Sequence, residues 1–167
     1  MIFDNDHFTA KLLETVLLSF DVGKVSIIQS MDEATLYLKN HKVDCMMMEW
    51  YDWEKPNLNL LSFIRTSGSA LNAEMPVIMC TGYTDFDHIV RARDAGANEV
   101  VAKPISPKQV FEKLYNAMFK TRVFIADETF TGPDRRRHSG AFHGQDRRVG
   151  ASMSQSDIDQ VMNEKHE

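Results

Sequence analysis

The chain has 167 residues, of which 43% are hydrophobic, and this is enough for one packed domain with a tail. Its formal net charge of −5 argues against attraction of the whole molecule to nucleic acid. No apolar stretch approaches the roughly 20 residues of a membrane span, and no basic region followed by an apolar run indicates a signal peptide. Cys45 and Cys80 each lie in an apolar run without metal-ligand spacing, which predicts reduced core thiols in a cytoplasmic protein.

Apolar runs alternate with amphipathic stretches through about residue 120. The short apolar runs predict five strands, at residues 2–3, 25–28, 45–48, 76–80 and 100–102. Apolar residues at helical spacing predict helices at 11–20, 30–39, 58–65, 85–95 and 106–120. Ser30 with Glu33 fits a capping box, Ser106 and Pro107 fit the start of a helix, and Gly96 fits the position after a helix end.

Short apolar strands separated by helices favour a parallel sheet that is covered on both faces. Ligand chemistry in such sheets lies at the carboxyl ends of the strands. The polar residues at these ends are Asp4-Asn5-Asp6, Glu49, Thr81-Gly82 and Lys103-Pro104. Since the first, third, fourth and fifth strands would be neighbours, we expect a pocket with carboxylates, one hydroxyl and one ammonium group.

These strand ends, together with residues 76–81 and 95–98, carry a family resemblance. Over roughly residues 1–120 the chain resembles response-regulator receiver domains. The resemblance implies an α/β fold: a flavodoxin-like (βα)5 doubly wound parallel sheet with strand order 2-1-3-4-5. Members of this family bind Mg²⁺ and accept a phosphoryl group on an aspartate that follows the third strand.

The chain departs from the family pattern inside the pocket. The resemblance places Glu49 at the phosphoacceptor position and Asn5 where one of two acidic metal-site residues is usual. Thr81 and Lys103 match the switch hydroxyl and the lysine that pairs with phosphate. Val100 falls where many members carry a switch aromatic. The resemblance therefore implies an atypical receiver in which Glu49 is not expected to be phosphorylated.

Elementary chemistry indicates that these departures act together. Asp4, Glu49 and Lys103 carry a formal charge of −1, and the amide of Asn5 is a poorer Mg²⁺ ligand than a carboxylate. Glu49 reaches about 1.5 Å further than an aspartate, so that it could pair with Lys103 and accept a hydrogen bond from Thr81. We therefore expect no cofactor and no metal, with Mg²⁺ weak or absent and Asp4, Asn5 and Glu49 as the residual candidate ligands.

The loop after the third strand holds three aromatic residues, Trp50, Tyr51 and Trp53. They form either a partner-binding surface or a cover for the sheet, and the sequence leaves both readings open. Asp52 is the nearest other aspartate and is expected to be a solvated loop residue. At the N-terminus, a central strand as short as residues 2–3 buries little, so we expect the natural chain to begin a few residues upstream.

Residues 121–167 are predicted to form a mostly disordered tail, most clearly over 127–151. The segment 131–150 has five Arg against two Asp, a net charge of +3, and includes Arg135, Arg136 and Arg137. The segment 151–167 has one Lys against four acidic residues, a net charge of −3. Within it, residues 156–165 favour one short amphipathic helix, with an apolar face of Ile158, Val161 and Met162.

Residues 153–162 carry a second resemblance, to the short N-terminal peptide of the flagellar motor switch protein. That peptide docks as a helix on the helix 4–strand 5–helix 5 face of the chemotaxis receiver. The resemblance implies that Ile158, Val161 and Met162 contact a receiver face, either in this chain or in a partner. The alternative is a capped surface helix without a binding role.

These observations predict a stand-alone atypical receiver that is not an enzyme and that acts in signal transduction by protein–protein binding. A histidine kinase, a phosphotransfer protein and a flagellar or chemotaxis component are the expected partner classes. One alternative is a conventional Mg²⁺-dependent phosphoacceptor in a two-component phosphorelay. Another is a binder of nucleic acid or acidic protein surfaces through Arg135, Arg136 and Arg137, although the net charge of −5 argues against nucleic acid.

Overall fold

The structure is a computed structural model that describes residues 1–50, 57–66, 71–83, 85–120, 122–126 and 130–134, all within one compact unit. Its strands are β1 (Ile2–Phe3), β2 (Ile27–Ile28), β3 (Met46–Glu49), β4 (Val77–Thr81), β5 (Glu99–Ala102), β6 (Phe124–Ala126) and β7 (Thr131–Pro133). Its helices are α1 (His7–Leu18), α2 (Met31–Asn40), α3 (Asn57–Thr66), α4 (Phe86–Asp94) and α5 (Pro107–Phe119).

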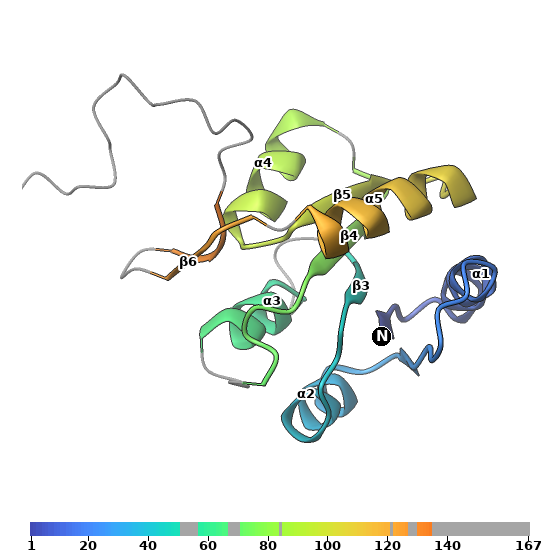
Figure 1. Cartoon of the computed structure of the whole chain (residues 1–167), viewed down its shortest axis with the longest axis horizontal. Helices are drawn as coiled ribbons and strands as arrows, with labels where there is room; N and C mark the ends of the chain where they lie inside the picture. Colours follow the sequence, from blue (N-terminus) through green and yellow to red (C-terminus); the bar gives the residue numbers. More distant parts are fainter. Residues whose placement is uncertain (51–56, 67–70, 84, 121, 127–129, 135–167) are drawn as a thin grey trace, which may run out of the picture. The chain divides into compact units, whose positions relative to one another are not determined.

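The first five strands form one parallel sheet in the order β2-β1-β3-β4-β5, which confirms the expected topology (Figure 1). The central strand β1 pairs with both neighbours, so that Ile2 stands beside Ile27 and Met47. The ammonium group of Met1 donates to the carbonyl oxygen of Cys45 at 2.9 Å. Because all strand pairs in this sheet are parallel, the strands end at the same edge, where their last side chains meet.

Alternate residues of each strand face opposite layers of helices, as expected for a strand with a two-residue repeat. Met46 and Met48 pack in the core beneath α2, α3 and α4, whereas Met47 packs in the core beneath α1 and α5. Cys80 belongs to the second core and is fully buried, and both Cys45 and Cys80 are free thiols. The inner strands β1, β3 and β4 are therefore almost entirely apolar, because they are buried on both faces.

Capping side chains position the helices at the predicted places. The hydroxyl of Ser30 accepts from the N–H of Glu33 at 3.3 Å, and the hydroxyl of Ser106 accepts from the N–H of Gln109 at 3.4 Å. Gly96 follows α4 with a φ of 99°, a left-handed conformation that favours glycine. These contacts satisfy main-chain groups that the helices leave unpaired at their ends.

One helix boundary was predicted wrongly. Helical spacing predicts a start near Lys11, but α1 begins at His7 because Asp6 caps it. The carboxylate of Asp6 accepts from the N–H of Phe8 at 3.1 Å and from the hydroxyl of Thr9 at 2.6 Å. These hydrogen bonds hold the pKa of Asp6 below its ordinary value.

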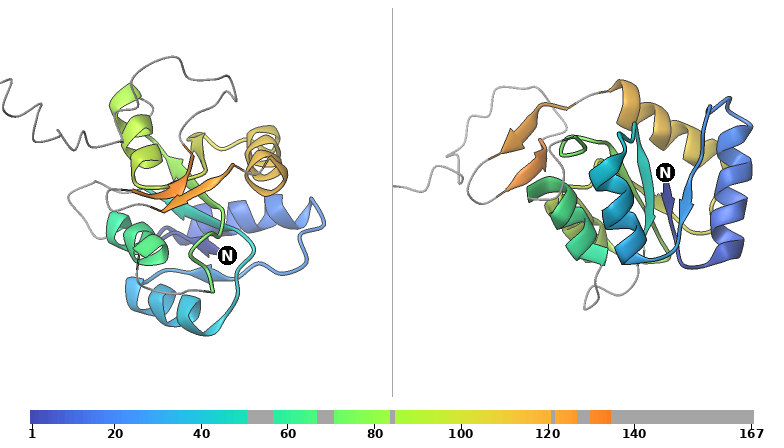
Figure 2. Two further views of the ribbon diagram at one scale, coloured as in Figure 1. Left: turned by 60° about the vertical axis from the view of Figure 1, so that its left-hand side comes forward. Right: turned by 90° about the horizontal axis from the view of Figure 1, so that it is seen from below.

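The segment after α5 also differs from the expectation of a mostly disordered tail from residue 121. Strands β6 and β7 form an antiparallel hairpin, which lies beside α3 (Figure 2). Phe130 and Gly132 are buried there, which is the physical reason that this part is folded. The two arginine clusters and the expected helix at 156–165 lie outside the described residues.

Arg65 holds the hairpin side of the domain together. Its guanidinium group, 4% exposed, donates to the carbonyl oxygens of Gly96, Ala73 and Met75 at 2.7–3.1 Å. It also lies 5.5 Å from the ring centre of Phe124 in β6. Burial lowers the pKa of Arg65 to about 10, because the low-dielectric surroundings disfavour its charge.

Candidate functional site

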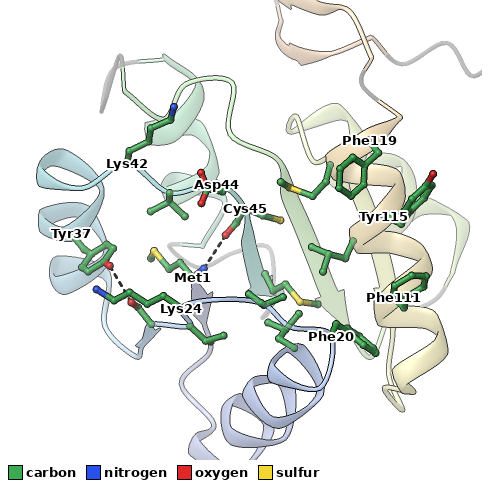
Figure 3. Close-up of a pocket in the computed structure, with 18 residues that line it drawn as sticks. Met1, Phe20, Lys24, Tyr37, Lys42, Asp44, Cys45, Phe111, Tyr115 and Phe119 are labelled. Carbon is green, nitrogen blue, oxygen red and sulfur yellow. Dashed lines mark hydrogen bonds between the residues drawn. The ribbon is translucent and has the colours of Figure 1, made fainter.

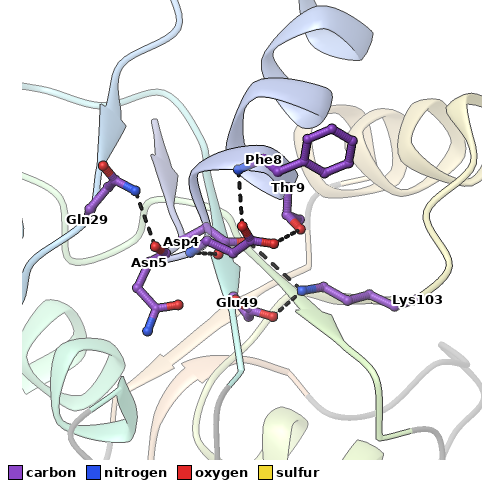
Figure 4. Close-up of polar contacts among 8 residues, drawn as sticks. Asp4, Asn5, Phe8, Thr9, Gln29, Glu49 and Lys103 are labelled. Atoms are coloured by element: carbon purple, nitrogen blue, oxygen red, sulfur yellow. Dashed lines mark hydrogen bonds and ion pairs between the residues drawn. The ribbon is translucent and has the colours of Figure 1, made fainter.

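The predicted pocket residues come together at the carboxyl edge of the sheet. Asp4 follows β1, Glu49 and Thr81 end β3 and β4, and Lys103 follows β5. Figure 4 shows the ammonium group of Lys103 between the two carboxylates. Lys103 Nζ forms an ion pair with Glu49 Oε1, and it lies 4.0 Å from Asp4 Oδ2. This arrangement follows directly from four parallel strands that end at the same edge.

Asp4 is the most deeply buried ionisable group of the pocket, with 1% of its surface exposed. One carboxylate oxygen accepts from the N–H of Asp6 at 2.8 Å. Burial, followed by the hydrogen bond with the carboxyl group of Glu49, raises the pKa of Asp4 to about 6. Lys103 opposes this rise, so one ammonium group compensates two neighbouring carboxyl groups only in part.

The main-chain carbonyl of Asn5 and the carboxylate of Asp6 accept hydrogen bonds from groups other than the Lys103 ammonium. The main-chain carbonyl of Asn5 accepts from the side-chain amide of Gln29 at 3.3 Å. The carboxylate of Asp6 is the N-cap of α1. Of the three polar residues after β1, Asp4 is therefore the one whose carboxylate approaches Lys103.

Thr81 and Val100 occupy positions on the two strands nearest Lys103. The hydroxyl of Thr81, in a residue that is 3% exposed, accepts from the N–H of Tyr83 at 3.0 Å. Val100 stands beside Met79 in the sheet and packs against the core under α4. The N–H of Lys103 donates to the carbonyl oxygen of Thr81 at 2.8 Å, which fixes this lysine to the end of β4. A hydrogen bond from Thr81 to Glu49 stays a prediction.

The aromatic residue directly after Glu49 belongs to the core. Trp50 is 4% exposed, and its main-chain N–H donates to the carbonyl oxygen of Cys80 at 2.8 Å. Trp50 therefore covers the sheet and does not belong to an exposed partner-binding surface. Tyr51, Asp52 and Trp53 lie outside the described residues.

The start of α4 adds side chains that the sequence did not single out. The ring of Tyr83 stacks on the imidazole of His88 with 4.8 Å between ring centres. His88 Nδ1 lies 2.5 Å from the carboxylate of Asp85, the N-cap of α4. Hydrogen bonds from His88 hold the pKa of Asp85 below its ordinary value. The position of His88 three residues after Asp85 could have predicted the contact between these two residues. The stacking of Tyr83 on His88 could not be predicted, because it depends on how the loop folds.

The donor set at this edge fits a divalent cation poorly. Within the described ranges, no group of three or more His, Cys, Asp or Glu side chains could hold a metal ion. The ammonium group of Lys103 lies between the carboxylates of Asp4 and Glu49, where it repels a second cation. Magnesium is usually held by one or two carboxylates and several waters, and here both carboxyl groups face the ammonium group of Lys103 instead.

A family model for the response regulator receiver domain matches residues 1–115. The chain belongs to this family. Receiver domains are modules of two-component signalling that interact with histidine kinases and other proteins. Within the described parts of the chain, no helix is both long enough and apolar enough to cross a membrane.

Among curated proteins, the receiver is 28% identical over 78 residues to the phosphate regulon transcriptional regulatory protein PhoB of Klebsiella pneumoniae. It is 30% identical over 84 residues to a chemotaxis protein CheY homolog of Campylobacter jejuni. These matches cover 46% and 50% of this chain, and 34% and 62% of the two relatives. The chain therefore spans less than two thirds of the length of these curated relatives.

Solved structures show the same fold. A response regulator of Thermotoga maritima matches with a TM-score of 0.62 and 24% identity, over 71% of this chain and 94% of that one. A receiver domain of a sensor histidine kinase from Pseudomonas aeruginosa matches with a TM-score of 0.59 and 17% identity, over 70% and 94%. That structure has a magnesium ion coordinated in its active-site cleft. At these identities the likeness concerns the fold alone.

Proposed function

We propose that this receiver signals by protein–protein binding without being phosphorylated. The observation that carries the proposal is the ion pair between Lys103 and Glu49 at the carboxyl edge of the sheet. By the family resemblance, Glu49 stands at the phosphoacceptor position, and the lysine pairs with the phosphoryl group in phosphorylated members. The carboxylate of Glu49 supplies the negative partner for Lys103 that a phosphoryl group would otherwise supply.

The surroundings of the ion pair support its persistence. The side chains of Glu49 and Lys103 are only 12% and 24% exposed, so water and salt screen their attraction weakly. Phosphoryl transfer would require a carboxylate oxygen of Glu49 to leave its ammonium partner and attack phosphorus. The poor fit of the donor set to Mg²⁺ removes the cation that neutralises the phosphodonor in the family's chemistry. Binding of Mg²⁺ is accordingly proposed to be weak or absent.

The binding surface that we propose is the face of α4, β5 and α5. Phe86 and Ile89 lie three positions apart on α4 and are 79% and 39% exposed, and neighbouring exposed apolar side chains of this size favour a contact surface. On the same face, Glu99 of β5 forms ion pairs with Lys113 at 2.8 Å and Arg122 at 3.1 Å. A histidine kinase, a phosphotransfer protein and a flagellar or chemotaxis component are the partner classes proposed for this face.

Partner capture without any phosphodonor tests this proposal. We expect the wild-type chain to retain a specific protein partner from lysate and Glu49→Ala to lose most of it, because the pocket then lacks its ion pair. Asp32→Ala, which removes an exposed carboxylate on α2, is the matched control and should bind as the wild type does. Equal capture by the wild type and Glu49→Ala, or capture that requires a phosphodonor, would contradict the proposal.

A further inference from the structure

A pocket lies at the edge of the sheet where the strands begin, opposite the edge that carries Glu49 and Lys103. It has a volume of about 440 Å³, within the range of roughly 300–1,000 Å³ for ligand pockets. The C-terminal end of α1 and the stretch of α5 from Phe111 to Phe119 line it, together with residues between Val22 and Ser26 and between Lys42 and Met47. We call this pocket the basal groove, and Figure 3 shows its lining side chains.

One wall of the basal groove is a row of aromatic side chains on α5. Phe111, Tyr115 and Phe119 follow each other at four-residue spacing, with ring centres 6.3 and 5.2 Å apart. They are 51%, 48% and 72% exposed, and Phe20 extends the row by an edge-on contact with Phe111 at 5.3 Å. Contiguous exposed apolar surface of this kind marks interaction sites, because leaving it in water costs free energy.

The opposite wall is cationic. Lys24 and Lys42 line the groove, and Asp44 is the one carboxylate among its lining residues. Within the described part of the chain, neither lysine lies within ion-pair distance of a carboxylate. Figure 3 shows Lys24 and Lys42 on the side of the groove away from Phe111 and Phe119.

We infer that the basal groove binds an acidic amphipathic helix of a partner protein. Phe119 lies eight positions after Phe111 on α5, which makes a ridge of about 12 Å that suits the side of a helix of two to three turns. The apolar face of such a helix packs on the aromatic wall, and its acidic flank faces Lys24 and Lys42. The basal groove shares α5 with the face of α4, β5 and α5, but no residue of α4 or β5 lines it, and neither do Glu49 and Lys103.

A peptide titration on the full chain tests the inference. The probe is a synthetic peptide of about 14 residues with Leu on one face and Glu on its flanks, and the matched control has Lys in place of Glu. We expect the acidic peptide to bind about tenfold more tightly than the basic one and to shift amide signals of α1, α5 and residues 42–47. Equal binding of both peptides, no binding, or shifts confined to α4 and β5 would overturn the inference.

Substitutions on each wall identify the contacts. The double variant Lys24→Glu with Lys42→Glu should reverse the preference between the two peptides, and Phe119→Ala should weaken both, since this ring is 72% exposed and its loss spares the core. Lys11→Glu, on α1 outside the groove lining, should leave the preference unchanged. A preference that persists in the double variant would contradict the role of the cationic wall.

The groove must also be open in the free protein. A photo-crosslinking amino acid in place of Phe119 tests this in the full chain, before and after addition of the acidic peptide. A crosslink to the peptide supports the inference. A crosslink within the chain that the peptide does not displace would show that the chain fills its own groove, and it would overturn a partner in trans.

Discussion

Lys103 faces two carboxyl groups, of which Asp4 is almost fully buried and Glu49 is nearly so. Removal of the ammonium group leaves two like charges without compensation in a place that water hardly reaches. We therefore expect Lys103→Met to lower the free energy of unfolding at neutral pH by about 2–4 kcal/mol, as measured by urea denaturation. The loss should shrink in acid, where the carboxyl groups bind protons.

Lys11→Met is the control for this substitution, because Lys11 pairs with Glu14 at 2.7 Å on the exposed surface of α1. Exposed pairs contribute at most about 1 kcal/mol. If Lys103→Met cost no more than Lys11→Met, the pocket would lack the electrostatic coupling inferred from its burial.

Asp4 makes the stability of the fold depend on pH. Its folded-state pKa, raised by burial to about 6, exceeds the ordinary value of 3.8, so the folded state binds the proton more tightly than the unfolded state. Protonation of Asp4 therefore stabilises the fold, fully below about pH 4, and this stabilisation is lost as the pH rises through about 6. Asp4→Asn, which stays neutral, should gain stability relative to the wild type over this range, by on the order of 1–3 kcal/mol.

Unfolding free energies of the wild type and of Asp4→Asn, measured between pH 4 and pH 8, test the expected gain in stability. Asp32→Asn, on the surface of α2, should show no comparable rise over the same range. A constant difference between Asp4→Asn and the wild type at all pH values would show that Asp4 titrates as an ordinary carboxylate.

Several residue positions could be predicted because strand ends meet wherever parallel strands share an edge. Asp4, Glu49 and Lys103 were predicted to lie together on that ground and on the strand order that the family resemblance implies. The capping role of Asp6 was missed because it consists of hydrogen bonds to the N–H of Phe8 and the hydroxyl of Thr9, which an apolar pattern does not report. Hydrogen bonds at a helix start do not require an apolar face, so a prediction from apolar periodicity places the start of such a helix too late in the sequence.

At the scale of elements, the hairpin of β6 and β7 depends on a close contact of two glycines. A Cβ atom on Gly132 would lie 2.9 Å from the Cα atom of Gly96, which is main chain and cannot move aside easily. We therefore expect Gly132→Ala to destabilise the domain by about 1–3 kcal/mol in thermal or urea unfolding.

Gly23→Ala is the matched control, because a Cβ atom there has no neighbour within 4 Å. It should change the stability by less than about 0.5 kcal/mol. If the two alanine variants unfolded alike, the hairpin would not pack on Gly96 as described.

The hairpin escaped prediction for a physical reason. Each of its strands has three residues, and its stability comes from contacts with Arg65 and Gly96, which are distant in the sequence. The apolar run at Phe124 and Ile125 was the one local signal. Long-range contacts of this kind leave no periodicity in the segment that folds onto them.

At the scale of the whole molecule, the order of the five parallel strands was predictable because short, fully apolar strands alternate with amphipathic helices. The basal groove was not predictable. Its walls come from Phe111 on α5 and from Lys24 and Lys42 in loops, which only the folded chain brings together. Residues 135–167, including Ile158, lie outside the described residues, so what the sequence predicts for them stays a prediction.

The central claim is that Glu49 and Lys103 replace phosphorylation, and intact-mass spectrometry after incubation with acetyl phosphate and Mg²⁺ tests it most directly. We expect no added phosphoryl group on the wild-type chain, only partial transfer in Glu49→Asp, and more in the double variant Glu49→Asp with Asn5→Asp. The double variant restores both the shorter acceptor and the second acidic residue, so it also shows that the assay works. Stoichiometric, Mg²⁺-dependent addition of a phosphoryl group to the wild-type chain would contradict the claim.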